Sequence, residues 1–495
     1  MNKTAKILFI VGVFFASIFG AQSAFAEGET CETIAVNDVC VATFSDALTQ
    51  LTDNVNNRIY ENNVIVYADL EDAGTDYYIF PQNANITIDF NGHNVSVARQ
   101  FVVFHTKVSL VGQGVFSTTT KFFINLAGSS SVDAENYTVF SVGEGVVLES
   151  NNTTANTIIS MALSNSSWGT RKYGVVINLD GTLRTSYPDT DTIGIFILGT
   201  YGDAGAIINI GETGKIERMD VPVYAAGGVI LTSAGEIHGI TNGIEVRSGE
   251  LNITGGSITV DAETKYDVGP KPTNGSSILG AAIVVSQHTT KMPITINISG
   301  GTFTADKAFV EANVINNPDA SISLVTGVVT GGTFISTDNT GGAEAILSEH
   351  WTGFISGGTY SVKPKDEYIA PGYELKQRSE SLWEVIPEGS EDQVPVDDDT
   401  NPAVPDTGFG AEIERFKSAK DGHSGNFIII LSLVAFYLVF IYKLWYNYLD
   451  INNKGKYESY RKTTHRDSGG SDNHGRRQRN YCRRTKGFTR RPGSA

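Results

Sequence analysis

The sequence feature that most limits the fold is a double glycine followed by a small hydroxylated residue and a large apolar one. It occurs four times, at spacings of 45, 31 and 26 residues. A glycine supplies the positive φ of a tight corner, and the residues after it alternate as in a β-strand. A corner followed by a strand, repeated at uneven intervals, is typical of the stacked coils of a solenoid. The eight glycines, expected as structural turn residues, are Gly255, Gly256, Gly300, Gly301, Gly331, Gly332, Gly357 and Gly358.

Two all-β folds compete for this pattern. A row of β-sandwiches would show repeats of about 100 residues with long alternating strands. The strand-like segments here are short instead, as in residues 85–97, where Ile86 and Phe90 belong to an apolar-polar alternation and Asn91-Gly92 provides a turn. We therefore predict a right-handed parallel β-helix, a solenoid without long helices.

Three segments interrupt the strand pattern. Ala42–Leu51 has apolar residues at helical spacing, which predicts a short helix that caps the first coil. Asn151–Thr170 and Asp261–Gly275 lack the alternation and predict loops that extend from one face of the solenoid.

Charge is distributed unevenly along the chain. The formal net charge is -17, yet residues 451–495 contain 13 Lys and Arg against 3 Asp and Glu. The rest of the chain is therefore strongly acidic. Because nucleic-acid binding needs Lys and Arg to neutralise phosphates, we expect no nucleic-acid partner.

The first 26 residues have the features of a secretory signal peptide. Lys3 and Lys6 precede the apolar run Ile7–Gly20, and Ala24-Phe25-Ala26 offers small residues at a cleavage position. The alternative is an uncleaved anchor, for which this apolar run is short. We expect an exported chain that begins near Glu27.

A second apolar segment, residues 427–446, predicts one transmembrane helix. About 20 apolar residues suffice to cross a bilayer, and basic residues follow at once, which places the tail 447–495 in the cytoplasm. The preceding residues 387–426 are acidic and contain proline, as expected of an extended stalk. The predicted protein is a single-pass cell-membrane protein with the β-helix, residues 61–386, outside the cell.

Cys31 and Cys40 lie just after the predicted cleavage site. In an oxidising compartment two nearby cysteines predict a local disulfide, here within a cap region that we place at residues 27–60. Two cysteines without a nearby His are a poor metal site. Cys482 follows the predicted span and would be on the other side of the membrane.

Two phrases of the sequence are similar to a known family. Ala42–Leu51 followed by NITIDFNGHNVSV, and residues 355–377 (ISGGTYSVKPKDEYIAPGYELKQ), resemble the opening and closing segments of pectin-lyase-like β-helix modules in bacterial surface proteins. The resemblance covers roughly residues 42–386. It implies a secreted right-handed β-helix, in a family that includes many surface-display proteins without an assigned activity.

The stalk contains a second resemblance, to the LPXTG-type signal of sortase substrates. In that family the motif precedes an apolar helix and a basic tail, and Thr407 would be the residue joined to the cell wall. This chain departs from the pattern because Val replaces Leu and residues 409–426 separate the motif from the helix. Wall linkage is therefore the alternative to a plain membrane anchor. The motif consists of Val404, Pro405, Asp406, Thr407 and Gly408.

Catalysis by a secreted β-helix would mean polysaccharide cleavage, and we looked for its residues. Lyases of this fold need acidic residues for Ca²⁺ and a basic residue, and hydrolases need a carboxylate pair. Gly92-His93-Asn94 and Ile237-His238-Gly239 come nearest to the phrases of the hydrolase family, but neither has an acidic partner placed like the family's. We expect no catalytic residue and no cofactor, with Ca²⁺ as the one ion to consider. The remaining acidic and histidine candidates are Asp189, Asp191, Asp203, His105, His288 and His350.

Binding is the expected activity. The parallel face of a solenoid with aromatic residues in or near its loops could stack sugar rings, although the same tyrosines could simply pack between coils. We predict a membrane-anchored, non-catalytic surface protein that acts in adhesion or binds a glycan or a partner cell. The alternative is a membrane-tethered polysaccharide lyase or glycoside hydrolase. The tyrosines considered are Tyr77, Tyr78, Tyr173, Tyr187, Tyr201 and Tyr266.

Overall fold

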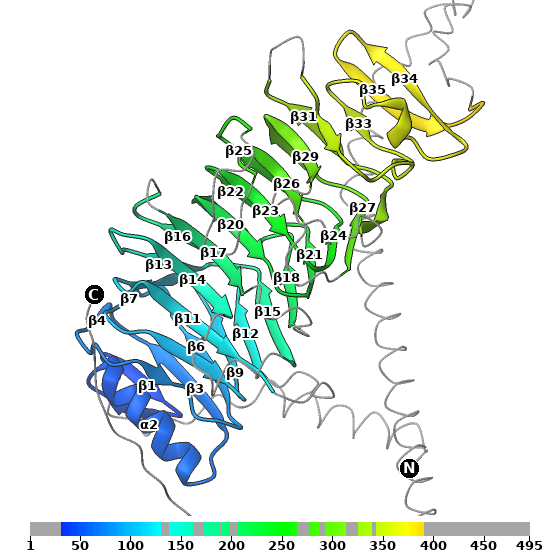
Figure 1. Ribbon diagram of the computed structural model, residues 1–495. Helices are drawn as coiled ribbons and strands as arrows, with labels where there is room; N and C mark the ends of the chain where they lie inside the picture. Colours follow the sequence, from blue (N-terminus) through cyan, green and yellow to red (C-terminus); the bar gives the residue numbers. More distant parts are fainter. Residues whose placement is uncertain are drawn as a thin grey trace, which may run out of the picture. The chain divides into compact units, whose positions relative to one another are not determined.

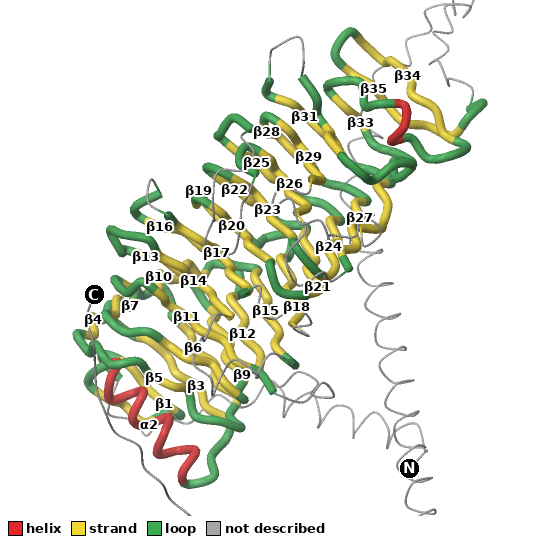
Figure 2. The backbone as a smooth tube through the Cα atoms, viewed as in Figure 1, coloured by secondary structure: helices red, strands yellow, loops and turns green. Residues whose placement is uncertain are grey.

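The described strands form three long sheets, drawn in Figures 1 and 2. The computed structural model describes residues 31–129, 138–161, 173–188, 191–198, 206–264, 278–286, 293–312, 325–338 and 343–390. Sheets A, B and C have 12, 13 and 10 strands.

In spatial order, the strands of sheet A are β2 (Val39–Val41), β1 (Ile34–Val36), β3 (Glu61–Val66), β6 (Asn85–Asp89), β9 (Lys107–Val111), β12 (Thr138–Val142), β15 (Val175–Leu179), β18 (Ala206–Ile210), β21 (Val229–Ser233), β24 (Gly249–Ile253), β27 (Ile294–Ile298) and β30 (Val325–Val329).

The strands of sheet B, from the N-terminal end, are β4 (Leu70–Asp72), β7 (Val95–Val97), β10 (Gly114–Thr118), β13 (Val146–Ser150), β16 (Thr182–Thr185), β19 (Lys215–Met219), β22 (Glu236–Gly239), β25 (Ser257–Val260), β28 (Thr302–Ala305), β31 (Thr333–Ser336), β33 (Thr359–Tyr360), β35 (Leu382–Pro387) and β34 (Tyr373–Ser379).

The strands of sheet C, in the same direction, are β5 (Tyr78–Ile79), β8 (Phe101–Phe104), β11 (Phe122–Ala127), β14 (Asn156–Met161), β17 (Thr192–Ile197), β20 (Val221–Ala225), β23 (Asn242–Val246), β26 (Ala281–Ser286), β29 (Lys307–Ala312) and β32 (Ile346–Ser348).

From β3 to β32, successive strands belong to sheets A, B and C in turn. Three consecutive strands, one in each sheet, make up one coil. From β3 to β29 every strand pairs in parallel with the strand three places later, as β15 does with β18. This is a three-sided β-solenoid, so the sandwich alternative is wrong. Thr302 pairs with Ser257 in the preceding coil and with Thr333 in the next, so each interval between double glycines is one coil, as expected.

The double glycines lie at the corner from sheet A to sheet B, and the two members of a pair have different environments. The second glycine has a left-handed backbone conformation, with φ between +74° at Gly256 and +99° at Gly332. At the first glycine a Cβ would press on the preceding coil, as at Gly300, where it would lie 2.5 Å from the Thr254 carbonyl oxygen. Gly255 is different, because the nearest atom to its Cβ would be Ala234 Cβ at 3.8 Å.

Aromatic side chains after these corners stack in the interior. The ring centroids of Phe303 and Phe334 are 4.8 Å apart, and those of Phe334 and Tyr360 are 5.0 Å apart at 9°. Successive coils therefore repeat the same inward residue at the spacing of neighbouring strands, and the large apolar residue of the motif belongs to the core.

The N-terminal end of the core is closed by helix α2 (Phe44–Asn56). Thr43 and Asp46 form a reciprocal capping box at its start, and Phe44, Leu48 and other apolar residues are buried against the first coils. The helix continues five residues past the predicted end at Leu51. Cys31 and Cys40 form the expected disulfide, with Cα atoms 5.6 Å apart, beside the antiparallel pair β1–β2.

At the C-terminal end, sheet B continues into the antiparallel strands β33, β35 and β34, after the short 3₁₀ helix η2 (Asp366–Tyr368). Tyr368 is buried, and its hydroxyl donates to the Ser348 carbonyl oxygen at 2.8 Å. Both ends of the solenoid are thus covered by non-repeating elements, which protects its terminal strands from pairing with other chains.

One loop prediction is wrong. The segment predicted as the loop Asn151–Thr170 contains β14, whose residues Asn156–Met161 are all buried. Sheet C also bends: Phe123 and Ile124 of β11 both face the core, as do Ile158 and Ile159 of β14. Two consecutive inward residues violate strict alternation, which explains why the pattern in this sheet is hard to recognise in the sequence.

Several predicted segments lie outside the described residues. They are the signal peptide 1–26, most of the stalk, the motif Val404–Gly408, the span 427–446 and the tail 447–495. In the part of the chain that the structure describes, no helix is long and apolar enough to cross a membrane.

Candidate functional site

The outer face of sheet A carries a continuous column of small polar side chains. The strand register places one such residue of each strand from β3 to β27 in line, and every member is Ser, Thr or Asn. We call this set the polar column. Its members are Asn63, Thr87, Ser109, Ser141, Asn178, Asn209, Thr232, Asn252 and Asn297.

Amide hydrogen bonds run along the polar column from coil to coil. Asn178 Nδ2 donates to Ser141 Oγ at 3.0 Å, and Asn209 Nδ2 donates to Asn178 Oδ1 at 2.9 Å. Asn297 Nδ2 donates to Asn252 Oδ1 at 2.9 Å. These bonds fix the side chains at the strand spacing of about 4.8 Å, while each amide keeps further donor or acceptor capacity. The column is therefore an ordered, uncharged hydrogen-bonding surface.

Sheet B has a charged outer face in its middle coils. Arg184 Nε lies 3.1 Å from Glu149 Oε1, and Lys215 Nζ lies 2.9 Å from Glu236 Oε2, each pair joining neighbouring strands. The hydrogen bond from Lys215 to Glu236 is the main cause of a raised Lys215 pKa. In later coils the same face carries hydroxyls instead, as at Thr259.

A bulge in β19 brings three more charged or titratable residues together. Two residues, Glu217 and Arg218, stand opposite His238 of β22, because the register shifts between Ile216 and Met219. Arg218 has φ +37°, in the left-handed region. Arg218 Nε lies 3.6 Å from Asp261 Oδ2, and His238 Nε2 lies 2.8 Å from Asp261 Oδ1. We call Arg218, His238 and Asp261 the bulge cluster.

The bulge cluster gives His238 a carboxylate partner from another coil, in addition to Glu236, which precedes it by two residues in the sequence. Asp261 follows the strand of the next coil, 23 residues later, and only the solenoid register brings the two side chains together. Glu236 and Asp261 flank this part of sheet B, so His238 lies among charges of both signs.

The outer face of sheet C is buried, unlike that of the other sheets. Tyr224, Glu245 and Arg247 are each 0% exposed, yet their neighbours Val223, Ile244 and Val246 point into the core. Arg247 Nε donates to Glu245 Oε1 at 2.8 Å, and the guanidinium carbon lies 5.2 Å from the centre of the Tyr224 ring. This set combines an ion pair with a cation–π contact. The sequence signal was available, since residues 245 and 247 are two residues apart, a spacing that favours the same side of an extended segment.

The buried set on sheet C has no reactive base that we can identify. Burial, with a smaller contribution from Glu245, raises the pKa of Tyr224, while Arg247 opposes this rise. Arg247 keeps its proton in proteins. In the described strands β14, β17, β20, β23, β26 and β29 the carboxylates are Glu245, which pairs with Arg247, and Glu311, which contacts Ser348 and His350.

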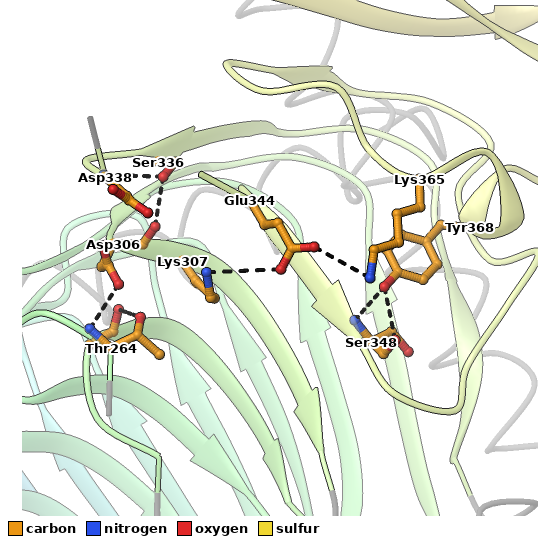
Figure 3. A network of polar contacts seen from close by, with 10 residues as sticks. Thr264, Asp306, Lys307, Ser336, Asp338, Glu344, Ser348, Lys365 and Tyr368 are labelled. Atoms are coloured by element: carbon orange, nitrogen blue, oxygen red, sulfur yellow. Dashed lines mark hydrogen bonds and ion pairs between the residues drawn. The ribbon is translucent and has the colours of Figure 1, made fainter. Parts of the chain in front are cut away.

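Near the C-terminal end, polar contacts tie the later coils to the closing segment (Figure 3). The Asp306 carboxylate accepts from the Thr264 N–H at 2.8 Å. Glu344 lies between Lys307, at 4.0 Å, and Lys365, at 3.3 Å. The Tyr368 hydroxyl and then Glu344 raise the pKa of Lys365. These contacts join strands to loops, and we interpret them as structural.

The four tyrosines that the structure describes, among those considered as sugar-stacking residues, lie at two places: Tyr77 and Tyr78 at β5, and Tyr173 and Tyr187 next to β15 and β16. Tyr77 is 67% exposed in the first coil, while Tyr187 is 44% exposed after β16, several coils later. Tyr78 packs on α2, where its hydroxyl donates to the Leu48 carbonyl oxygen at 2.8 Å. Tyr173 forms an isolated bridge with Ser129. Tyr201 and Tyr266 lie outside the described residues.

The remaining candidates are also dispersed. His105 has φ +53° and a pKa lowered by burial, and His350 Nδ1 lies 3.3 Å from the buried Glu311 carboxylate at the C-terminal end. Asp191 precedes β17, whereas Asp189, Asp203 and His288 lie outside the described residues. Among the residues described, no three His, Cys, Asp or Glu side chains gather in a way that could hold a metal ion.

Comparisons with protein-family models, curated proteins and solved structures found no match for this chain.

Proposed function

We propose that this chain is a membrane-anchored, extracellular surface protein whose β-helix binds a glycan or a partner-cell surface without cleaving it. The observation that carries the proposal is the polar column, an ordered surface of hydroxyl and amide groups along nine strands of sheet A. Sugars are recognised by such planar donor and acceptor groups. The regular spacing favours an extended polymer over a small molecule.

The proposal includes the finer features expected from the sequence. A right-handed winding is the sense that parallel strand connections adopt in nearly all proteins. The predicted signal peptide and the span 427–446 would export the solenoid and hold it at the membrane, with the stalk between them. The resemblance to pectin-lyase-like surface modules supports the same arrangement.

The test is a glycan array probed with the full-length chain in detergent. We expect selective binding, and we expect the double variant Asn178→Leu/Asn209→Leu to lose it, because leucine removes the amide groups at similar size. Asn57→Leu, at the exposed C-cap of α2, is a control outside the polar column. Binding that survives in the double variant, or the absence of any glycan ligand, would contradict the proposal.

A second candidate, a membrane-tethered polysaccharide lyase or hydrolase, is favoured by one observation. Asp261 and His238 form the kind of carboxylate–histidine pair that can move a proton. If the chain is such an enzyme, polysaccharides incubated with it will be shortened, and His238→Gln will abolish the shortening. Intact polysaccharide after prolonged incubation would remove this candidate.

A further inference from the structure

Folding stability alone does not explain the bulge cluster. The side chains of Arg218, His238 and Asp261 are 54%, 38% and 42% exposed. Ion pairs at such exposed positions contribute little to stability. A left-handed backbone is unfavourable for a residue with a long side chain, and Arg218 adopts one. The exposed ion pairs therefore do not account for this strained backbone, and backbone strain of this kind is found at binding sites.

The cluster has hydrogen-bond donors that face solvent. The Arg218–Asp261 distance of 3.6 Å is longer than a hydrogen bond, so the planar guanidinium retains its N–H groups for another acceptor. His238 directs Nε2 at Asp261 and so holds this carboxylate beside Arg218. The Thr259 side chain, paired in register with His238, adds a hydroxyl on the same face.

Each of the three nearby carboxylates has a basic neighbour. Asp261 contacts both His238 and Arg218. Glu236 pairs with Lys215 at 2.9 Å, and Glu217 lies close enough to Lys215 to add to the rise of its pKa. Of the two cations here, Arg218 therefore has more N–H groups without an acceptor within hydrogen-bond distance than Lys215 has. A planar guanidinium can form two parallel hydrogen bonds to a carboxylate or a sulfate.

We infer that the bulge cluster binds the acidic group, a carboxylate or a sulfate, of a glycan. The inference rests on the proposed function, which it deepens by naming the substituent that would be recognised. Arg218 pairs with the oxyanion, and the Thr259 hydroxyl donates to an oxygen beside it.

The test compares lactose with two derivatives that carry an acidic substituent at the same position, a sialic acid residue or a sulfate. Full-length chain in detergent is titrated with 3′-sialyllactose, 3′-sulfolactose and lactose. We expect at least one acidic form to bind roughly tenfold or more tightly than lactose, the scale of one charged hydrogen bond. Which acidic form binds distinguishes carboxylate from sulfate. Equal binding of all three, or binding of none, overturns the inference.

Variants separate this site from general electrostatics. Arg218→Gln should lower the affinity for the acidic form roughly tenfold and leave lactose unchanged, whereas Lys215→Gln, with the same charge change on a paired lysine, should have little effect. Asp261→Asn should raise the affinity because it removes a competing carboxylate and keeps its shape. Equal losses in Arg218→Gln and Lys215→Gln, or a loss in Asp261→Asn, contradict the inference. If neutral glycans on the array still bind while the acidic preference is absent, the proposed function stands and only the inference falls.

Discussion

The two glycines of a corner should respond differently to the same substitution. Gly255→Ala places a Cβ 3.8 Å from its nearest neighbour at ordinary φ, so we expect a change between zero and a gain of about 1 kcal/mol in the free energy of unfolding, from reduced freedom of the unfolded chain. Gly256→Ala combines φ +74° with overlap against the carbonyl oxygens of Gly235 and Ala234. Roughly 1–2 kcal/mol for the backbone and 1–3 kcal/mol for overpacking predict a loss of about 2–5 kcal/mol.

A third variant measures the cost of the left-handed backbone without any steric overlap. Gly92 has φ +86° with no atom within 4 Å of a new Cβ, so Gly92→Ala should lose only about 1–2 kcal/mol. The assay is proteolysis of the full-length chain across a urea series, in which a lower midpoint reports lower stability. The expected order of midpoints is Gly255→Ala, Gly92→Ala, Gly256→Ala, from highest to lowest. Equal losses for Gly255→Ala and Gly256→Ala would refute the assignment of separate roles.

Three further predictions follow from buried or covalent contacts. Arg247→Ala removes the guanidinium from the buried Glu245 and should lower the free energy of unfolding by about 3–5 kcal/mol, measured as a lower urea midpoint. The double variant Glu245→Leu/Arg247→Met should recover part of that loss. An Arg247→Ala variant as stable as the wild type would contradict this. Burial raises the pKa of Tyr78 to about 12, so the protonated phenol favours the folded state. That stability, roughly 2–3 kcal/mol, is complete below pH 10 and is lost as pH rises toward 12, so Tyr78→Phe should show a flatter alkaline denaturation profile; an unchanged profile would count against it. Reduction of the Cys31–Cys40 disulfide should weaken the N-terminal end by roughly 2–3 kcal/mol, seen as faster hydrogen exchange in α2, and Cys31→Ser/Cys40→Ser should match the reduced protein.

The repeating coils could be predicted from the sequence because the residues that mark them are close together in the chain. The double glycines mark corners that need a left-handed residue, and the apolar residue after each one is buried in the stack of Phe303, Phe334 and Tyr360. The capping helix was also visible, but its end was not, since residues 52–56 are mostly polar and gain their helical state from the turn before them.

Sheet C was less predictable, for a physical reason. Its strands are buried on both faces, so β14 lacks the apolar-polar alternation that marks a half-exposed strand. The bend at Phe123–Ile124 also shifts the alternation by one residue. Sequence patterns alone therefore gave a loop where the structure has a strand.

The contacts of the candidate sites depend on register between coils. His238 and Asp261 are 23 residues apart, and the distance between them is set by the lengths of the intervening corner and strands. The polar column is likewise visible only after nine strands are aligned. By contrast, Glu245 and Arg247 are two residues apart at the end of β23, a spacing that favours the same side of an extended segment and that the sequence shows directly.

The measurement that most directly tests the central claim follows the fate of a bound glycan. The full-length chain is incubated with a polysaccharide that it retains on the array, and the chain-length distribution of that polysaccharide is measured over time. Our account predicts retention with an unchanged distribution, because the polar column binds without supplying a catalytic pair. Progressive shortening of the polysaccharide, abolished by His238→Gln, would contradict it.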